Sequence, residues 1–233
     1  ALAGAALALG LTTGIDGWPG GGEPALLIGF PDCEAPGGGL IAQPTAAWTS
    51  LVFVAAGIWI IGDRRLVSLP RRLLFGSTIG AVGLGSFFGH AALTDWARQL
   101  DSLAIKLMLV TFIVAALGRL LASKDPALVT GWVGLAAVTV GFELAWPAAA
   151  EPLLVILAVA AITLAGLAAP PETRRWLAIG LLVIGAGGAA WWLGSKGGPL
   201  CAPWALFQLH GIWHILAAAG IVSVYQIYRS ETT

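Results

Sequence analysis

Three histidines are the residues of this chain best suited to metal chemistry. His210 and His214 stand four residues apart in the run His-Gly-Ile-Trp-His, and His90 is the remaining histidine of the sequence. On an α-helix, residues i and i+4 share one face, with about 5–6 Å between their Cβ atoms. Two imidazoles at this spacing suit one Zn²⁺ ion, and three protein ligands with a fourth position left for water are typical of catalytic zinc. We therefore predict that His90, His210 and His214 bind zinc; for each histidine taken alone, the alternative is a packed, hydrogen-bonded side chain.

Ser86 and Asp101 are the polar residues that accompany His90. Ser86 precedes His90 by four residues and so lies on the same helix face, and Asp101 opens the next predicted helix after a turn over 94–99. A carboxylate beside a metal site can accept a proton from water or orient a ligand imidazole. A structural alternative exists for both: a hydrogen bond from Ser86 to its own helix, and an interaction of Asp101 with a helix dipole.

Long apolar stretches must position these side chains. Crossing about 30 Å of hydrocarbon takes roughly 20 apolar residues, and seven stretches qualify, near 44–62, 73–93, 100–122, 127–146, 152–169, 175–194 and 207–228. The sequence thus predicts an all-α membrane protein, a single seven-helix transmembrane domain over 1–233 with an outer N-terminal segment over 1–43. The apolar run 1–13 is short for a span, and its role stays open between a trimmed helix, a signal remnant and a segment packed on the bundle.

The composition excludes several other classes of protein. Of the 233 residues, 58% are hydrophobic and only 10% are charged, against about 25% charged in soluble domains. A net charge of zero offers no basic patch for nucleic acid, and two cysteines without a CxxC pair exclude zinc fingers and iron–sulfur proteins. What remains is a multi-pass integral membrane protein whose oligomeric state the sequence leaves open.

The basic residues predict an orientation, because cytoplasmic loops are enriched in Lys and Arg. Counting seven spans places nine of the twelve basic residues on one side: Arg64, Arg65, Arg71, Arg72, Arg119, Lys124, Arg174, Arg175 and Arg229. The N-terminus is then outside and the C-terminus cytoplasmic. All three histidines fall near the non-cytoplasmic face. The inner halves of the spans are nearly all apolar, which disfavours a transporter, because a transporter would need polar residues along the whole depth of the bundle.

The motif residues resemble those of alkaline ceramidases. The resemblance lies in Gly-Ser-Phe-Phe-Gly-His-Ala-Ala-Leu over 85–93, in Gln-Leu-Asp over 99–101, and in the HxxxH of the last span. The shared pattern is a Ser four residues before a His, an Asp beyond the next loop, and the paired histidines, matched here by Ser86, His90, Asp101, His210 and His214. These enzymes belong to a superfamily of seven-span hydrolases that includes adiponectin-type receptors.

The resemblance implies an intramembrane zinc amidase. Zn²⁺ would be bound by His90, His210 and His214. Asp101 would act as general base on the water molecule that zinc activates. Ser86 would stabilise the oxyanion or hold that water molecule. The substrate would be a ceramide-like membrane lipid, cleaved to a sphingoid base and a fatty acid.

The segment before the first span departs from this family in part. Calcium-dependent alkaline ceramidases carry a richer acidic cluster here and a Glu where this chain has Gln43. Asp32 and Glu34 still offer oxygen ligands for Ca²⁺, with solvated loop acids as the alternative. The resemblance also favours a disulfide between Cys33 and Cys201, whose separation in space the sequence does not reveal.

Lys106 and Glu143 are ionisable residues within spans, at similar predicted depth, so an intramembrane ion pair is expected; Glu143 reaching the interface or facing a cavity is the alternative. An interfacial belt is expected from Trp48, Trp96, Trp146, Trp191, Trp192 and Trp204.

The leading prediction is a zinc hydrolase of a lipid amide. Two alternatives stay open: a zinc hydrolase of another acyl lipid such as an ester, and a non-catalytic lipid receptor with structural zinc.

Overall fold

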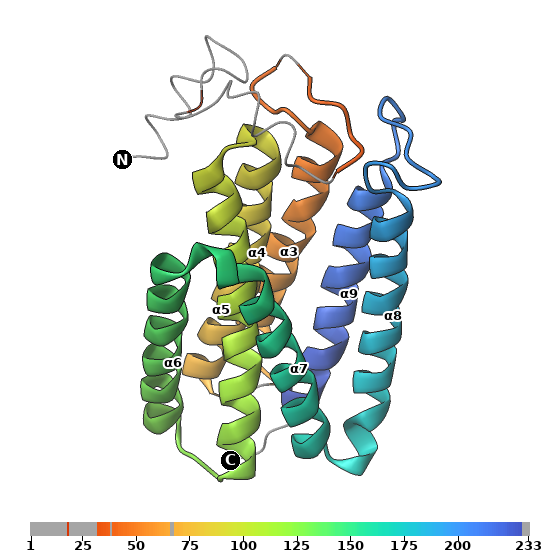
Figure 1. Ribbon diagram of the computed structural model, residues 1–233. Helices are drawn as coiled ribbons and strands as arrows, with labels where there is room; N and C mark the ends of the chain where they lie inside the picture. Colours follow the sequence, from red (N-terminus) through yellow and green to blue (C-terminus); the bar gives the residue numbers. More distant parts are fainter. Residues whose placement is uncertain (1–17, 19–31, 38, 66–67, 230–233) are drawn as a thin grey trace.

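The computed structural model describes Trp18 and residues 32–37, 39–65 and 68–229. Over these residues it contains seven long helices (Figure 1): α3 (Pro44–Gly62), α4 (Leu69–Ala92), α5 (Asp95–Leu120), α6 (Asp125–Ala145), α7 (Ala150–Ala168), α8 (Arg174–Leu193) and α9 (Leu209–Arg229). Short 3₁₀ helices, η2 (Pro147–Ala149) and η3 (Pro171–Thr173), precede α7 and α8. All seven spans are long and apolar enough to cross a membrane. The protein is therefore an all-α, multi-pass integral membrane protein. The run 1–13 lies outside the described residues.

Two of the predicted helix boundaries were wrong by about a turn. The expected turn over 94–99 is helical, because Leu93 takes a left-handed conformation (φ 49°), Thr94 is extended, and α5 already begins at Asp95. An acidic residue in the first turn stabilises that start through the helix dipole. Asp101 therefore lies in the second turn of α5. Helix α4 begins at Leu69 instead of 73, where the Ser68 side chain accepts a hydrogen bond from the Arg71 N–H.

The helices pack so that α3 contacts α4 and α9, α5 contacts α4, α6 and α7, and α8 contacts α9 (Figure 1). Small residues allow the close approaches, as is common in membrane bundles. A Cβ atom on Gly85 of α4 would lie 3.0 Å from Asp101 Cα, and one on Gly211 of α9 would lie 3.2 Å from the Thr49 side chain on α3. These two glycines therefore bring α5 and α3 next to the helices that carry the histidines.

A disulfide joins the segment before α3 to the connection between α8 and α9. Cys33 and Cys201 are bonded, with Cα atoms 5.5 Å apart. The Ala35 N–H donates to the Pro203 carbonyl at 3.0 Å, and Asp32 forms an isolated antiparallel bridge with Ser195. The pairing that the resemblance favoured is thus present, and it holds this segment over the end of the bundle where the histidines lie.

Candidate metal centre

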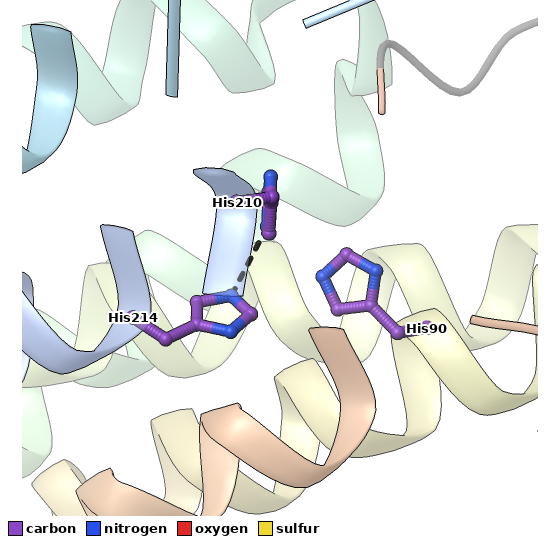
Figure 2. A group of neighbouring side chains, drawn as sticks. All are labelled: His90, His210 and His214. Carbon is purple, nitrogen blue, oxygen red and sulfur yellow. Dashed lines mark hydrogen bonds between the residues drawn. The ribbon is translucent and has the colours of Figure 1, made fainter. Parts of the chain in front are cut away.

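Two helix ends bring the three histidines together. His90 lies in the last turn of α4, and His210 and His214 lie in the first two turns of α9. Ring nitrogen atoms, one from each histidine, lie within 4.8 Å of one another, and Figure 2 shows the three rings around one shared space. His90 and His214 are only 4% and 3% exposed. The structure therefore contains a buried three-histidine cluster that can bind a metal ion.

The Nδ1 atom of every ring in this cluster faces an oxygen of a neighbouring side chain. The pairs are His90 with Gln43 Oε1 at 2.8 Å, His210 with Asp32 Oδ1 at 2.7 Å, and His214 with Thr49 Oγ1 at 3.1 Å. Metal-ligating histidines generally use the second nitrogen in this way, which orients the ring.

The surroundings of these oxygens indicate which nitrogen carries the proton. The Gln43 Nε2 donates to the Glu34 carbonyl at 2.9 Å, so its Oε1 accepts from His90. The Thr49 hydroxyl donates to the Thr45 carbonyl at 2.7 Å, so its oxygen accepts from His214. Asp32 Oδ1 lies 2.7 Å from His210 Nδ1 as an ion-pair contact without hydrogen-bond geometry. A carboxylate oxygen carries no proton to share, so it disfavours a lone pair on the nitrogen that faces it. All three rings are therefore assigned a proton on Nδ1 and a lone pair on Nε2.

The Nε2 atoms of His210 and His214 lie 3.1 Å apart (dashed line in Figure 2). Two lone pairs at this distance repel unless a cation or a proton lies between them. Neutral imidazoles suit zinc, copper, iron and nickel. The residues present therefore fit a transition-metal ion, although the ligand set does not identify which one.

Ser86 and Asp101 line the same cavity as the three histidines. The cavity has a volume of about 600 Å³, and apart from its polar end it is lined mostly by apolar side chains of α3, α4, α5, α7, α8 and α9. Ser86 Oγ lies 3.4 Å from His214 Nε2. Asp101 Oδ1 is buried and has no hydrogen-bond partner. A hydroxyl group and an unengaged carboxylate oxygen thus accompany the imidazoles at the polar end of an apolar cavity.

The two acidic residues predicted as calcium ligands have different partners. Asp32 faces the histidines, with Oδ2 3.6 Å from His90 Nδ1 in addition to its contact with His210. Burial acts to raise the pKa of Asp32, but the interactions with His210, His90 and Arg98 together outweigh it and lower that pKa. Glu34 accepts from the Thr45 and Ala46 N–H groups at 2.7 and 2.9 Å and so caps α3. Both carboxylates thus have protein partners in this structure. Calcium binding by Asp32 and Glu34 stays a prediction.

Sequence reasoning missed two partners of the histidines. Thr49 was not singled out, and Gln43 was noted only as a departure from the family pattern. Both lie in or next to the first turns of α3, and a polar residue at the histidine end of a span is the signal that would have found them.

The expected intramembrane ion pair is present. Lys106 Nζ lies 2.7 Å from Glu143 Oε2 and donates to Ser102 Oγ at 2.5 Å. Lys106 is fully buried and Glu143 is 3% exposed. The tryptophans of the predicted belt are all at least one-third exposed, from 38% for Trp96 and Trp191 to 84% for Trp204.

A scan of the chain against protein-family models finds no match, and a search of curated proteins finds none either. The resemblance to alkaline ceramidases therefore rests on the motif residues alone. The coarser conclusion is independent of it: the chain is a seven-helix membrane protein with a buried three-histidine cluster able to hold a metal ion.

Proposed function

We propose that this protein is an intramembrane zinc-dependent hydrolase that cleaves the amide bond of ceramide-like lipids to a sphingoid base and a fatty acid. The observation that carries the proposal is the convergence of His90, His210 and His214 at the polar end of a largely apolar cavity. Apolar walls suit acyl chains, and the few polar groups at one end suit the group to be cleaved.

We assign the residues these roles in the proposed reaction. A zinc ion held by the three histidines would supply a Lewis acid that polarises a carbonyl and lowers the pKa of water. Asp101 offers a buried oxygen without a hydrogen bond, which makes it the proton acceptor. Ser86 has its hydroxyl at the same end of the cavity, where it can donate to the carbonyl oxygen as that atom gains charge.

The substrate class rests on the resemblance, because an ester carbonyl would fit the same chemistry. The orientation of the chain is likewise part of the proposal: with the basic residues of the sequence on the cytoplasmic side, the cavity's polar end would face the non-cytoplasmic leaflet.

The decisive experiment couples metal analysis to lipid hydrolysis. The purified full chain is assayed for bound metal by elemental analysis, then incubated with a ceramide and, separately, with a diacylglycerol, and both products are quantified by mass spectrometry. We expect bound zinc and release of sphingoid base together with fatty acid, lost on chelation and regained on adding zinc. Release of fatty acid from the diacylglycerol but not from the ceramide would show that the substrate is an ester lipid instead of an amide. Bound metal with no release from either lipid would favour a receptor with structural zinc.

A further inference from the structure

Three consecutive residues ahead of α3, Asp32, Cys33 and Glu34, contact the candidate metal ligands or the elements around them. Asp32 contacts an imidazole through its carboxylate, Cys33 forms a disulfide, and Glu34 accepts hydrogen bonds from the N-terminus of α3. We call residues 32–34 the clasp. It lies outside the helices, yet it contacts α3, α9 and the connection before α9.

The Asp32 carboxylate touches two of the three candidate metal ligands. Its Oδ1 lies 2.7 Å from His210 Nδ1 on α9, and its Oδ2 lies 3.6 Å from His90 Nδ1 on α4. Asp32 is 9% exposed, so the carboxylate acts on these rings with little screening by water. One side chain thereby links ligands that lie 120 positions apart in the sequence.

The other two clasp residues hold Asp32 in place. Cys33 is bonded to Cys201 in the connection between α8 and α9. The Glu34 carboxylate caps α3, and its carbonyl accepts from Gln43 Nε2 at 2.9 Å. The Gln43 Oε1 in turn accepts from His90. The clasp therefore supports His210 directly and His90 both directly and through Gln43.

We infer that Asp32 is a positioning residue of the metal centre and that the Cys33–Cys201 disulfide keeps it there. A carboxylate on Nδ1–H fixes the tautomer of the ring and raises the basicity of Nε2, which strengthens metal binding. Loss of such a partner typically weakens metal affinity by about 10–100-fold. The inference rests on the proposed function only in that a metal occupies the site; it does not require hydrolysis.

Asp32→Asn tests the inference, because asparagine keeps the shape and one acceptor oxygen but removes the charge. Zinc affinity of the purified full chain is measured by competition with a chromogenic chelator, and the visible absorption band of the Co²⁺-loaded protein is recorded. We expect affinity to fall by about 10–100-fold and the Co²⁺ band to shift, with the thermal unfolding temperature of the metal-free protein unchanged. Asp95→Asn is the matched control: it removes an exposed carboxylate at the same end of the bundle, and both readouts should stay as in the parent chain.

The disulfide is tested in a double-mutant cycle with Cys33→Ser and Cys201→Ser together. Without the disulfide, zinc affinity should fall, and adding Asp32→Asn should weaken it further by less than in the parent chain, because the two changes act through one segment. If the cysteine variant does not fold, Asp32→Asn still decides the positioning role of Asp32.

Unchanged zinc affinity and an unchanged Co²⁺ band in Asp32→Asn would overturn the inference, even if the parent protein cleaves lipids. Weakened affinity in Asp32→Asn would support it, even if the parent cleaves no lipid, in which case the proposed function fails and the positioning role stands.

Discussion

The two ends of the helix bundle both bury polar side chains, but they use them differently. At the end opposite the histidines, Asp63 after α3 pairs with Arg229 of α9 at 2.7 Å, and Arg71 of α4 pairs with Asp125 of α6 at 2.9 Å. These groups form ion pairs that tie helices together. At the histidine end, the three histidines and Asp101 line a cavity, and Asp101 Oδ1 has no hydrogen-bond partner. Paired groups contribute to stability, whereas groups held open toward a cavity are available for chemistry.

Helix α5 shows the same contrast within little more than a turn. Lys106 is fully buried and forms an ion pair with Glu143, whereas Asp101 forms no ion pair with a described residue and its Oδ1 has no hydrogen-bond partner. An unpaired buried polar atom is costly, and Asp101 is the acidic residue of α5 that lines the cavity of the histidines. The contrast with Lys106 predicts how variants at each place should behave.

The largest effect is expected for His214→Ala. The change removes one of three Nε2 donors, so bound zinc and lipid hydrolysis should both be lost, as measured by elemental analysis and product release. Full hydrolysis with no zinc bound would reject the metal mechanism.

Asp101→Asn should separate chemistry from metal binding. The amide cannot accept the proton, so turnover should fall by about 10²–10⁴-fold while zinc content stays at the parent level, measured on the same preparation. Loss of zinc with surviving turnover after metal reconstitution would make Asp101 a support for the ligands instead of the base.

Lys106→Met should affect stability without affecting zinc content. It leaves Glu143 buried without its cation, a change that costs about 3–5 kcal/mol in buried pairs, measurable by denaturant unfolding in detergent. The double variant Lys106→Met with Glu143→Leu is the control and should recover most of the loss. Loss of zinc in the single variant, with the fold intact, would place this pair in the metal centre.

Asp63→Asn tests the opposite end. Arg229 is partly exposed in this pair, with 23% of its side chain accessible, so the free energy of unfolding should fall by only about 1–2 kcal/mol. Zinc affinity should match that of the parent chain. A weakened zinc site would contradict the division of roles between the two ends.

The smallest effect is expected for Tyr228→Phe. The Tyr228 hydroxyl is buried and has no hydrogen-bond partner within the described residues, so its removal should leave the free energy of unfolding unchanged or raise it by up to about 1 kcal/mol. A clear destabilisation in the same unfolding assay would reveal a partner for that hydroxyl.

The sequence by itself determined what depends on neighbours along the chain. The length of each apolar run predicts a membrane span, and so seven helices. Two helix starts differ from the prediction by about a turn, one where the Ser68 side chain caps α4 and one where the backbone turns at Leu93 and Thr94 before α5. The spacing of His210 and His214 is set by one helix, so their shared face was also foreseen.

Only the tertiary structure decided what depends on distances between helices. Gln43 accepts from His90, Thr49 accepts from His214, and the Asp32 carboxylate lies against His210. These contacts, and the Glu34 cap on α3, follow from helix packing and from a disulfide across most of the chain. The physical reason is that helix geometry fixes neighbours three and four residues apart, whereas contacts between helices depend on how closely their surfaces approach, which one sequence does not display.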